Sequence, residues 1–369
     1  MRRIVSSLFA HTFLFVLILT FAVSRGVRAD GVFAKDEAAN GELFASVESS
    51  LESAGERIRQ FAFDGDAQTY FASEKVAAPT DHFTLVIDRP ARIKSIVVTT
   101  GKPDGADKLA AGSVEISMDG KKFIEKAKFQ DGEAHVWSPE GEIRAIRVKP
   151  SADCKTPLVI REIALESNPK VVTFKYPVEF TIDVADAPEM KEWAEKAVQA
   201  CERSYTMINE ELASEGFTPP RTILMTLKSN YRGVAATAGD RIIGSVRYFK
   251  DHPDDIGAMV HETVHVVQSY RRGNNPSWLV EGISDYIRFF KYEPGKLKPP
   301  SREQARFNRS YRISAAFLAY LTEKYDKDIV RKLNKAMRQG EYDEKLFQES
   351  TGKSLGALGD EWRDSLEKN

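Results

Sequence analysis

Two histidines and a glutamate in the run His261-Glu262-Thr263-Val264-His265 are spaced for chemistry at a metal ion. On an α-helix, histidines four residues apart lie one turn apart on the same face, so both imidazoles can reach one ion. Glu262 would then stand beside that ion as a candidate general base for a water molecule. The run therefore predicts a zinc hydrolase site with His261 and His265 as two of the ligands.

The residues around this motif predict the helix that the ligands need. Side chains that can be buried recur at three- and four-residue steps, and Pro253, Asp254 and Asp255 mark the start of the pattern. The recurring positions are Ile256, Met259, Val260, Thr263, Val264 and Val267. We expect this stripe to bury the back of the helix and leave the histidines at the front.

A catalytic zinc with a water in its fourth position needs a third protein ligand. Some zinc peptidases supply a third histidine six residues after the second, with a glycine between them. Here these positions hold Arg271 and Gln268. We therefore expect the third ligand to be acidic.

A second amphipathic helix follows and carries two acids. Its apolar positions are Trp278, Leu279, Ile283, Tyr286, Ile287 and Phe290. Glu281 and Asp285 are four residues apart on its other face, so one carboxylate can bind zinc while the other orients a ligand histidine. The alternative is a pair of solvated acids on a surface helix. The Glu-x-x-x-Asp spacing after the motif resembles that of the gluzincins, the thermolysin-like zinc peptidases. This resemblance implies that Glu281 is a zinc ligand and that Asp285 orients a ligand histidine.

Length and composition describe an ordinary globular protein of about two domains. The chain has 369 residues, of which 42% are hydrophobic and 29% charged, which argues against disordered and fibrous classes. Cys154 and Cys201 are the two cysteines, so no disulfide framework is expected. We expect two separate thiols, with one bridge between domains as the alternative.

The first 29 residues are typical of a secretory signal peptide. Arg2 and Arg3 precede an apolar run over residues 13–23, and Val27-Arg28-Ala29 offers a cleavage site. A retained anchor is the alternative, but the run is shorter than the roughly 20 residues that a membrane span needs. We expect a secreted, periplasmic or extracellular protein. Cleavage would leave 49 basic and 54 acidic side chains, so nothing in the charge indicates binding to nucleic acid or to an anionic membrane.

The pattern predicts a β-sandwich over residues 55–168, after a lead-in segment at 30–54. Short segments rich in β-branched residues are separated by turn signals such as Asp119-Gly120. The predicted strands cover residues 83–87, 93–99, 114–118, 143–148 and 158–165. An antiparallel sandwich is therefore expected to precede the motif helices.

This region resembles discoidin, or coagulation-factor type C, modules. The resemblance rests on Phe63-Asp64-Gly65-Asp66, the strands at residues 83–88 and 114–117, and Ile160 to Ile163. It implies a structural calcium ion, for which the candidate ligands are Asp64, Asp66, Thr69 and Glu162. An Asp-Gly turn and an unrelated strand glutamate are the alternative. The resemblance also implies a glycan or cell-surface ligand, and the side chains that could contact it are Tyr70, His82, His135 and Trp137.

Residues 169–369 are expected to form an α+β domain of the zincin metallopeptidase type. After a linker at residues 168–170, the patterns predict a strand at 171–184, a helix at 188–214 and strands at 222–227 and 241–249. Three helices follow the motif, striped by residues 313–321, 329–337 and 355–366. In metallopeptidases that the motif resembles, the strand before the zinc helix is an edge that pairs with an extended substrate. The implied edge residues are Ile242, Ile243, Gly244, Ser245 and Val246, with an ordinary buried strand as the alternative.

Residues 172–367 resemble the basic secretory protein family of plants and bacteria. The matching segments are Val260 to Gln268, Leu279 to Arg288, Tyr311 to Tyr320, Leu333 to Arg338 and Thr351 to Leu355. This resemblance implies an extracellular, zinc-peptidase-like enzyme that acts on a protein or peptide.

The expected reaction is peptide hydrolysis by metal-activated water, with Glu262 as general base. Tyr311 lies in a segment similar to the one that holds the catalytic tyrosine of gluzincin aminopeptidases, and this implies that it stabilises the oxyanion. Tyr286 and Tyr270 remain alternatives for that role. A different hypothesis is a secreted, non-catalytic protein that binds glycan or a cell surface and keeps a zincin-like domain. A glycan-active enzyme with paired carboxylates would explain neither histidine.

Overall fold

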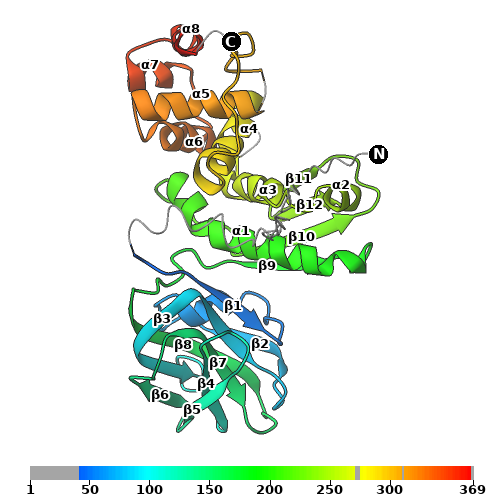
Figure 1. Ribbon diagram of the computed structural model, residues 1–369, viewed down its shortest axis with the longest axis vertical. Coiled ribbons are helices and arrows are strands. Elements are labelled where there is room, and N and C mark those ends of the chain that lie inside the picture. Colours follow the sequence, from blue (N-terminus) through cyan, green and yellow to red (C-terminus); the bar gives the residue numbers. More distant parts are fainter. Residues whose placement is uncertain (1–40, 271–274, 310, 367–369) are drawn as a thin grey trace, which may run out of the picture.

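The computed structural model describes residues 41–270, 275–309 and 311–366, so the predicted signal peptide lies outside the described residues. Figure 1 shows a β-sandwich at one end of the long axis, a small sheet with its helices in the middle and a helical group at the other end. Within the described ranges, no helix is both long enough and apolar enough to cross a membrane.

The sandwich consists of two antiparallel layers that share one long strand, β3 (Phe83–Thr100). The first half of β3 pairs with β1 and β7, and its second half pairs with β6 and β8. Its other elements are β1 (Ala45–Ser49), η3 (Arg59–Phe63), β2 (Phe71–Val76), β4 (Gly112–Ser117), β5 (Ile124–Lys128), β6 (Glu133–Trp137), β7 (Ile143–Pro150) and β8 (Pro157–Asn168). The predicted antiparallel sandwich is confirmed, although two of its predicted strands are the two halves of β3.

The sandwich is longer than the predicted range of 55–168. Strand β1 pairs with β3, and Leu43 pairs with Val171 in an isolated bridge. Val171 is buried in the core of the sandwich, and Phe174 packs against that core. The lead-in segment at 30–54 was predicted without a strand because β1 has only five residues and a weak apolar alternation. Both predicted boundaries therefore move outward.

The second unit is built on a four-stranded mixed sheet in the order β11-β12-β10-β9. Strands β9, β10 and β12 are parallel, and β11 is antiparallel to β12. The elements are β9 (Glu179–Asp183), η4 (Pro188–Met190), α1 (Lys191–Glu211), β10 (Thr222–Lys228), β11 (Ala235–Ala238), β12 (Arg241–Ser245) and α2 (Val246–Asp251). Helix α1, which was predicted at residues 188–214, lies along the sheet with Ala197, Cys201 and Tyr205 buried. The α+β class is confirmed.

The predicted substrate-binding edge strand, Ile242 to Val246, is wrong. Strand β12 has β11 on one side and β10 on the other, so its backbone groups are already paired. The strand also ends earlier than predicted, because the Ser245 hydroxyl accepts a hydrogen bond from the Tyr248 amide and caps α2. The edge of the sheet is β11, a strand that the sequence pattern did not reveal.

The motif lies on two packed helices, and a helical group completes the chain. These elements are α3 (Gly257–Gln268), α4 (Ser277–Tyr286), the π-helical η5 (Ile287–Tyr292), α5 (Tyr311–Lys324), α6 (Ile329–Gln339), α7 (Lys345–Thr351) and α8 (Leu355–Ser365). Both motif helices and three of the C-terminal helices were predicted, whereas α7 was not. At Gly282 a Cβ atom would lie 2.7 Å from the Ser314 Cβ, so glycine allows α4 and α5 to pack closely.

A buried polar joint connects the sandwich to the second unit. Glu179 at the start of β9 accepts hydrogen bonds from the Arg59 amide and the Ser53 hydroxyl, and its carboxylate pairs with the Arg59 guanidinium at 3.1 Å. Arg59 also faces Glu202 on α1 at 3.5 Å. Burial raises the pKa of Glu202 to about 7, and the charge of Arg59 partly offsets that effect. Removing Arg59 would leave two largely buried acids without their shared cation, so this contact should be costly to break.

Candidate metal centre and cleft

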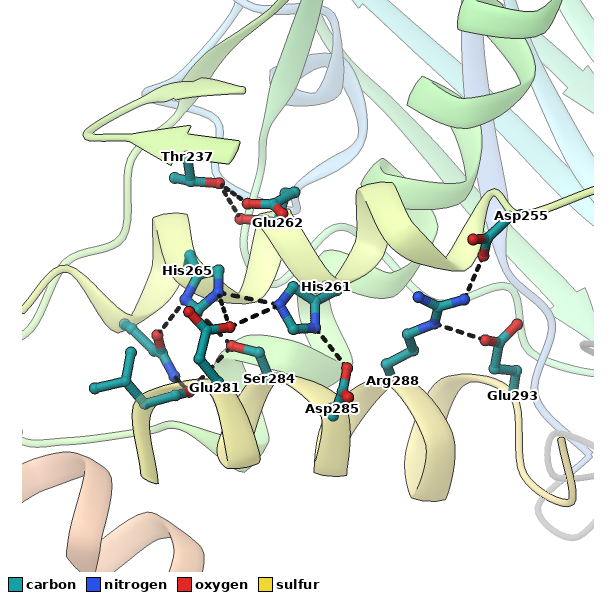
Figure 2. A network of polar contacts seen from close by, with 12 residues as sticks. Thr237, Asp255, His261, Glu262, His265, Glu281, Ser284, Asp285, Arg288 and Glu293 are labelled. Carbon is teal, nitrogen blue, oxygen red and sulfur yellow. Dashed lines mark hydrogen bonds and ion pairs between the residues drawn. The ribbon is translucent and has the colours of Figure 1, made fainter. Parts of the chain in front are cut away.

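Three side chains from α3 and α4 converge where the two helices face each other. The Nε2 atoms of His261 and His265 are 3.1 Å apart, and both lie close to Glu281 Oε2, at 3.2 Å and 3.1 Å respectively. Figure 2 shows the three side chains pointing toward one another from neighbouring helices. A metal ion needs at least three His, Cys, Asp or Glu side chains whose ligand atoms lie close together. Among the described residues, this trio meets that condition, with all three ligand atoms within 4.8 Å of one another.

The outer hydrogen bonds of the histidines define what faces the centre. His261 Nδ1 donates to Asp285 Oδ1 at 2.7 Å, and His265 Nδ1 donates to Gln268 Oε1 at 2.7 Å. With a proton on each Nδ1, the neutral rings present Nε2 lone pairs to each other and to the Glu281 carboxylate. In this tautomer three acceptors meet without a donor between them, an arrangement that a bound metal ion, or a proton on one of the rings, would stabilise.

The donor atoms fit a tetrahedral zinc ion. Zinc bonds of about 2.0–2.1 Å place ligand atoms of a tetrahedron about 3.3–3.4 Å apart, and the separations here are 3.1–3.2 Å. Burial alone would lower the pKa of His261, but hydrogen bonds to Asp285 and Glu281 and the charge of Glu262 raise it to about 9. The carboxylates thus make the centre attractive to positive charge. The site can hold a metal ion with one ligand position open.

Asp285 and Gln268 support the two histidines from opposite ends of the centre. Asp285 was predicted from the sequence as the acid that orients a ligand histidine. Gln268 was considered only as the residue that stands where a different zinc-peptidase pattern has glycine. The Gln268 side chain is almost fully buried and also donates from Nε2 to the Val280 carbonyl at 2.9 Å. These two hydrogen bonds fix the orientation of the Gln268 side chain and, through it, the position of the His265 ring. The sequence did contain a signal for this contact, because Gln268 follows His265 by three residues and so lies on the same face of the helix.

Glu262 is held at the side of the centre by a strand residue. The Thr237 hydroxyl on β11 contacts Glu262 Oε2 at 2.7 Å and the Glu262 carbonyl at 2.9 Å. Glu262 lines the cleft and is only 8% exposed. A hydrogen bond to one carboxylate oxygen leaves the other available for a water molecule. Thr237 was not predicted, because a threonine 25 residues before Glu262 has no sequence pattern in common with it.

The centre lies in an open cleft of about 1070 Å³. Its wall includes the edge strand β11, helix α3, helix α4 and the first turn of α5. None of the residues Ile242 to Val246 lines it, whereas Ala235, Ala236 and Thr237 do. The free edge of β11 therefore borders the metal ligands.

Of the three candidate tyrosines, Tyr311 stands beside the metal ligands. Its ring centroid is 6.4 Å from that of His261, and the side chain is 55% exposed in the cleft. The charge of Glu281, together with partial burial, raises the pKa of Tyr311, so its hydroxyl keeps its proton. The Tyr270 hydroxyl donates to Asn334 instead, and Tyr286 is buried and does not line the cleft.

The four calcium candidates gather in one corner of the sandwich. Asp64 accepts hydrogen bonds from the Thr69 hydroxyl and the Asp66 amide, and Glu162 accepts one from the Gly65 amide at 3.2 Å. Burial and the charge of Asp64 raise the pKa of Glu162 to about 7. The carboxylates of this corner do not reach the spacing found at the histidine centre. A calcium ion there stays a prediction.

The remaining candidates lie away from the cleft. Cys154 and Cys201 are free thiols, as expected, and burial raises the pKa of Cys201 to about 12, which makes it unsuited to be a nucleophile. Trp137 is 69% exposed on β6 and its ring stacks beside that of His135 at a centroid distance of 6.1 Å. Tyr70 lies under the Arg57 guanidinium. His82 is partly buried near the end of β1.

Comparison with known proteins identifies the second unit. A family model described as peptidase of plants and bacteria matches residues 178–363, which include the whole centre. No curated protein matches the chain.

Several solved structures are similar to about a third of the chain. One is the first family 32 carbohydrate-binding module from a family 31 glycoside hydrolase of Clostridium perfringens, with 16% identity over 33% of this chain and 92% of that one, at a TM-score of 0.29. Another is the pair of such modules from Clostridium perfringens ZmpB in complex with GalNAc, with 12% identity over 32% and 33% of the two chains and a TM-score of 0.29. A pectin-binding module has 19% identity over 33% and 89%, at a TM-score of 0.27.

Proposed function

Because this chain belongs to the peptidase family of plants and bacteria, we propose that it is a secreted, zinc-dependent peptidase that hydrolyses peptide bonds. The observation that supports this most directly is the convergence of His261, His265 and Glu281 beside Glu262 in an open cleft. The three ligands leave one position for water or substrate, as a catalytic zinc site requires.

The residues of the cleft have separate tasks in this reaction. When bound at the centre, zinc lowers the pKa of a water molecule and polarises a carbonyl group. Glu262 accepts the proton of that water and delivers it to the leaving nitrogen, while Thr237 keeps the carboxylate in place. Tyr311, whose hydroxyl keeps its proton, donates a hydrogen bond to the oxygen that becomes negative.

Strand β11 is the proposed substrate-binding edge. Among the residues that the structure describes, it pairs with β12 on one side only, and its residues Ala235 to Thr237 line the cleft next to Glu262. An extended peptide can hydrogen-bond to the free side of β11 as an added strand, which is β-augmentation. This would bring the scissile bond in line with the centre.

Replacing Tyr311 with phenylalanine tests its role. We expect kcat to fall roughly 100- to 1000-fold, because one donor to the oxyanion is lost. Zinc content should stay at the wild-type level, since the hydroxyl is not a ligand. Zinc analysis and peptide hydrolysis on the same sample measure both quantities, and unchanged turnover would reject the assignment.

Replacing the residues that support the histidines should weaken zinc binding without abolishing it. For Asp285→Asn and for Gln268→Leu, we expect the zinc dissociation constant to rise roughly 10- to 100-fold. Gln268→Leu removes the acceptor that holds the Nδ1 proton of His265. Asp285→Asn removes the negative charge from the acceptor of His261 and so weakens that hydrogen bond. Competition with a fluorescent zinc chelator measures the effect. An affinity equal to wild type in Gln268→Leu would show that this bond does not support His265.

The proposed function is tested by incubating the purified, zinc-loaded protein with a mixed library of quenched fluorescent peptides. Hydrolysis by wild type that is absent from Glu262→Gln would establish a peptidase and locate its base. No hydrolysis by either protein would contradict the proposal.

A second candidate function is that of a secreted protein which binds glycan or a cell surface. The exposed Trp137 beside His135 favours it, because aromatic faces can stack on sugar rings. Retention on insoluble polysaccharide without hydrolysis of any peptide would favour this function over the first. Retention together with hydrolysis would assign binding to the sandwich and catalysis to the second unit.

A further inference from the structure

Two arginines line one end of the cleft, and their surroundings differ. Arg288 is largely buried and forms ion pairs with both Asp255 and Glu293. Figure 2 shows its guanidinium between these two acids, on the side of Asp285 that faces away from Glu281. Asp255 also accepts a hydrogen bond from the Tyr248 hydroxyl at 2.7 Å. The charge of Arg288 is thus already balanced within the protein.

Arg312 has no such balance. It lines the cleft from the first turn of α5 and is exposed, and among the described residues it forms no ion pair with an acid. Its guanidinium carbon lies 5.3 Å from the ring centroid of Phe289. The guanidinium carbon of Arg288 lies 4.6 Å from the same centroid. Because Phe289 is buried, its ring is a fixed surface against which the Arg312 side chain can rest. The cleft therefore presents a positive charge that is positioned and unpaired.

The position of Arg312 relates this charge to the reacting bond. It follows Tyr311 directly, and the Tyr311 ring lies 6.4 Å from that of His261. Tyr248 and Val234 line the same cleft, and the Val234 carbonyl accepts a hydrogen bond from the Ser245 amide at the start of α2. This end of the cleft thus lies where β11 begins. A peptide paired with β11 would lie in the cleft that Arg312 also lines.

We propose that Arg312 binds a carboxylate of the substrate and so determines which peptides are cut. A guanidinium binds a carboxylate with two parallel hydrogen bonds, and the apolar support from Phe289 keeps its planar face oriented. In a peptide, this carboxylate is either an Asp or Glu side chain or the C-terminal carboxylate. The proposal rests on the proposed peptidase function and specifies the substrate class of the same site.

The test uses variants of a cleaved peptide in two sets of matched pairs. In the first set, each position near the scissile bond in turn holds either glutamate or glutamine. In the second, the C-terminus is either free or amidated. We expect wild type to cleave one acidic version at least tenfold faster, by kcat/KM, than its neutral partner, and Arg312→Gln to bring this ratio close to one. A preference for the side-chain pair assigns an internal acidic residue, and a preference for the terminal pair assigns a C-terminal carboxylate. Arg312→Lys should retain part of the ratio, because charge remains while the two-pronged geometry is lost.

Arg309→Gln is the matched control, since Arg309 is exposed nearby but does not line the cleft. It should leave the ratio unchanged. The proposal is overturned if wild type shows no preference within either pair, or if Arg312→Gln lowers hydrolysis of acidic and neutral peptides by the same factor. If wild type cleaves nothing, the peptidase proposal fails separately. Fluorescence anisotropy with the same labelled peptides then decides whether Arg312 binds a carboxylate.

Discussion

Replacing Glu262 with glutamine should lower kcat about a thousandfold while the protein keeps its zinc. Glutamine has the size of glutamate and can still accept a hydrogen bond from Thr237, so the cleft should keep its shape. It cannot take a proton from water at neutral pH, and the step in which Glu262 passes that proton to the leaving nitrogen is lost as well. Steady-state hydrolysis of the best library peptide and metal analysis on the same preparation measure the two quantities.

Glu349→Gln is the matched control for this change. Glu349 is exposed on α7 and does not line the cleft, so the same chemical substitution there should leave kcat at the wild-type value. A Glu262→Gln variant with full activity would mean that another group accepts the proton. A variant without zinc would mean that Glu262 acts through the structure of the centre rather than as a base.

The cluster of candidate metal ligands could be predicted because its signal is local. His261 and His265 are one helical turn apart, and Glu281 lies on the next helix at a spacing that resembles a known class. The supporting contact from Asp285 follows from the same periodicity. Gln268 also lies on the ligand face, but it was compared with the glycine of another pattern rather than considered as a hydrogen-bond partner. A spacing can thus identify ligands and still miss what holds them.

The edge strand could not be predicted because it depends on pairing between distant segments. The strand before the motif, β12, has a stronger apolar pattern than β11 because it lies between two neighbouring strands. The true edge, β11, is four residues long and half-exposed, so its sequence shows no clear period. Its importance is visible only once Thr237 is seen to contact Glu262. Burial makes a strand easier to detect in the sequence, whereas the strand that lines this cleft is the less buried one.

The sandwich presents a similar contrast. Its strands were predicted from alternation, but its connection to the second unit rests on Arg59, Glu179 and Glu202, which are charged residues far apart in the sequence. The sandwich therefore meets the second unit through a largely buried charged contact as well as through the linker.

Removing one metal ligand should have the other large effect. For His261→Ala, His265→Ala and Glu281→Ala, we expect zinc content to fall from about one ion per chain to near zero after dialysis, and hydrolysis to disappear with it. Two remaining donors cannot hold a catalytic zinc that needs three. The loss of affinity should exceed the roughly 10- to 100-fold change expected for a supporting residue.

His135→Ala is the control for these variants, because His135 is an exposed histidine on the sandwich and should leave zinc content unchanged. Circular dichroism should show that every variant keeps its helices, so that metal loss is not confused with unfolding. A ligand variant that retains both zinc and turnover would exclude that residue from the centre. The graded order, with Asp285→Asn and Gln268→Leu between wild type and the ligand variants, is the specific signature of this arrangement. A chance cluster of polar side chains would not distinguish the residues that face the ion from those that hold the rings.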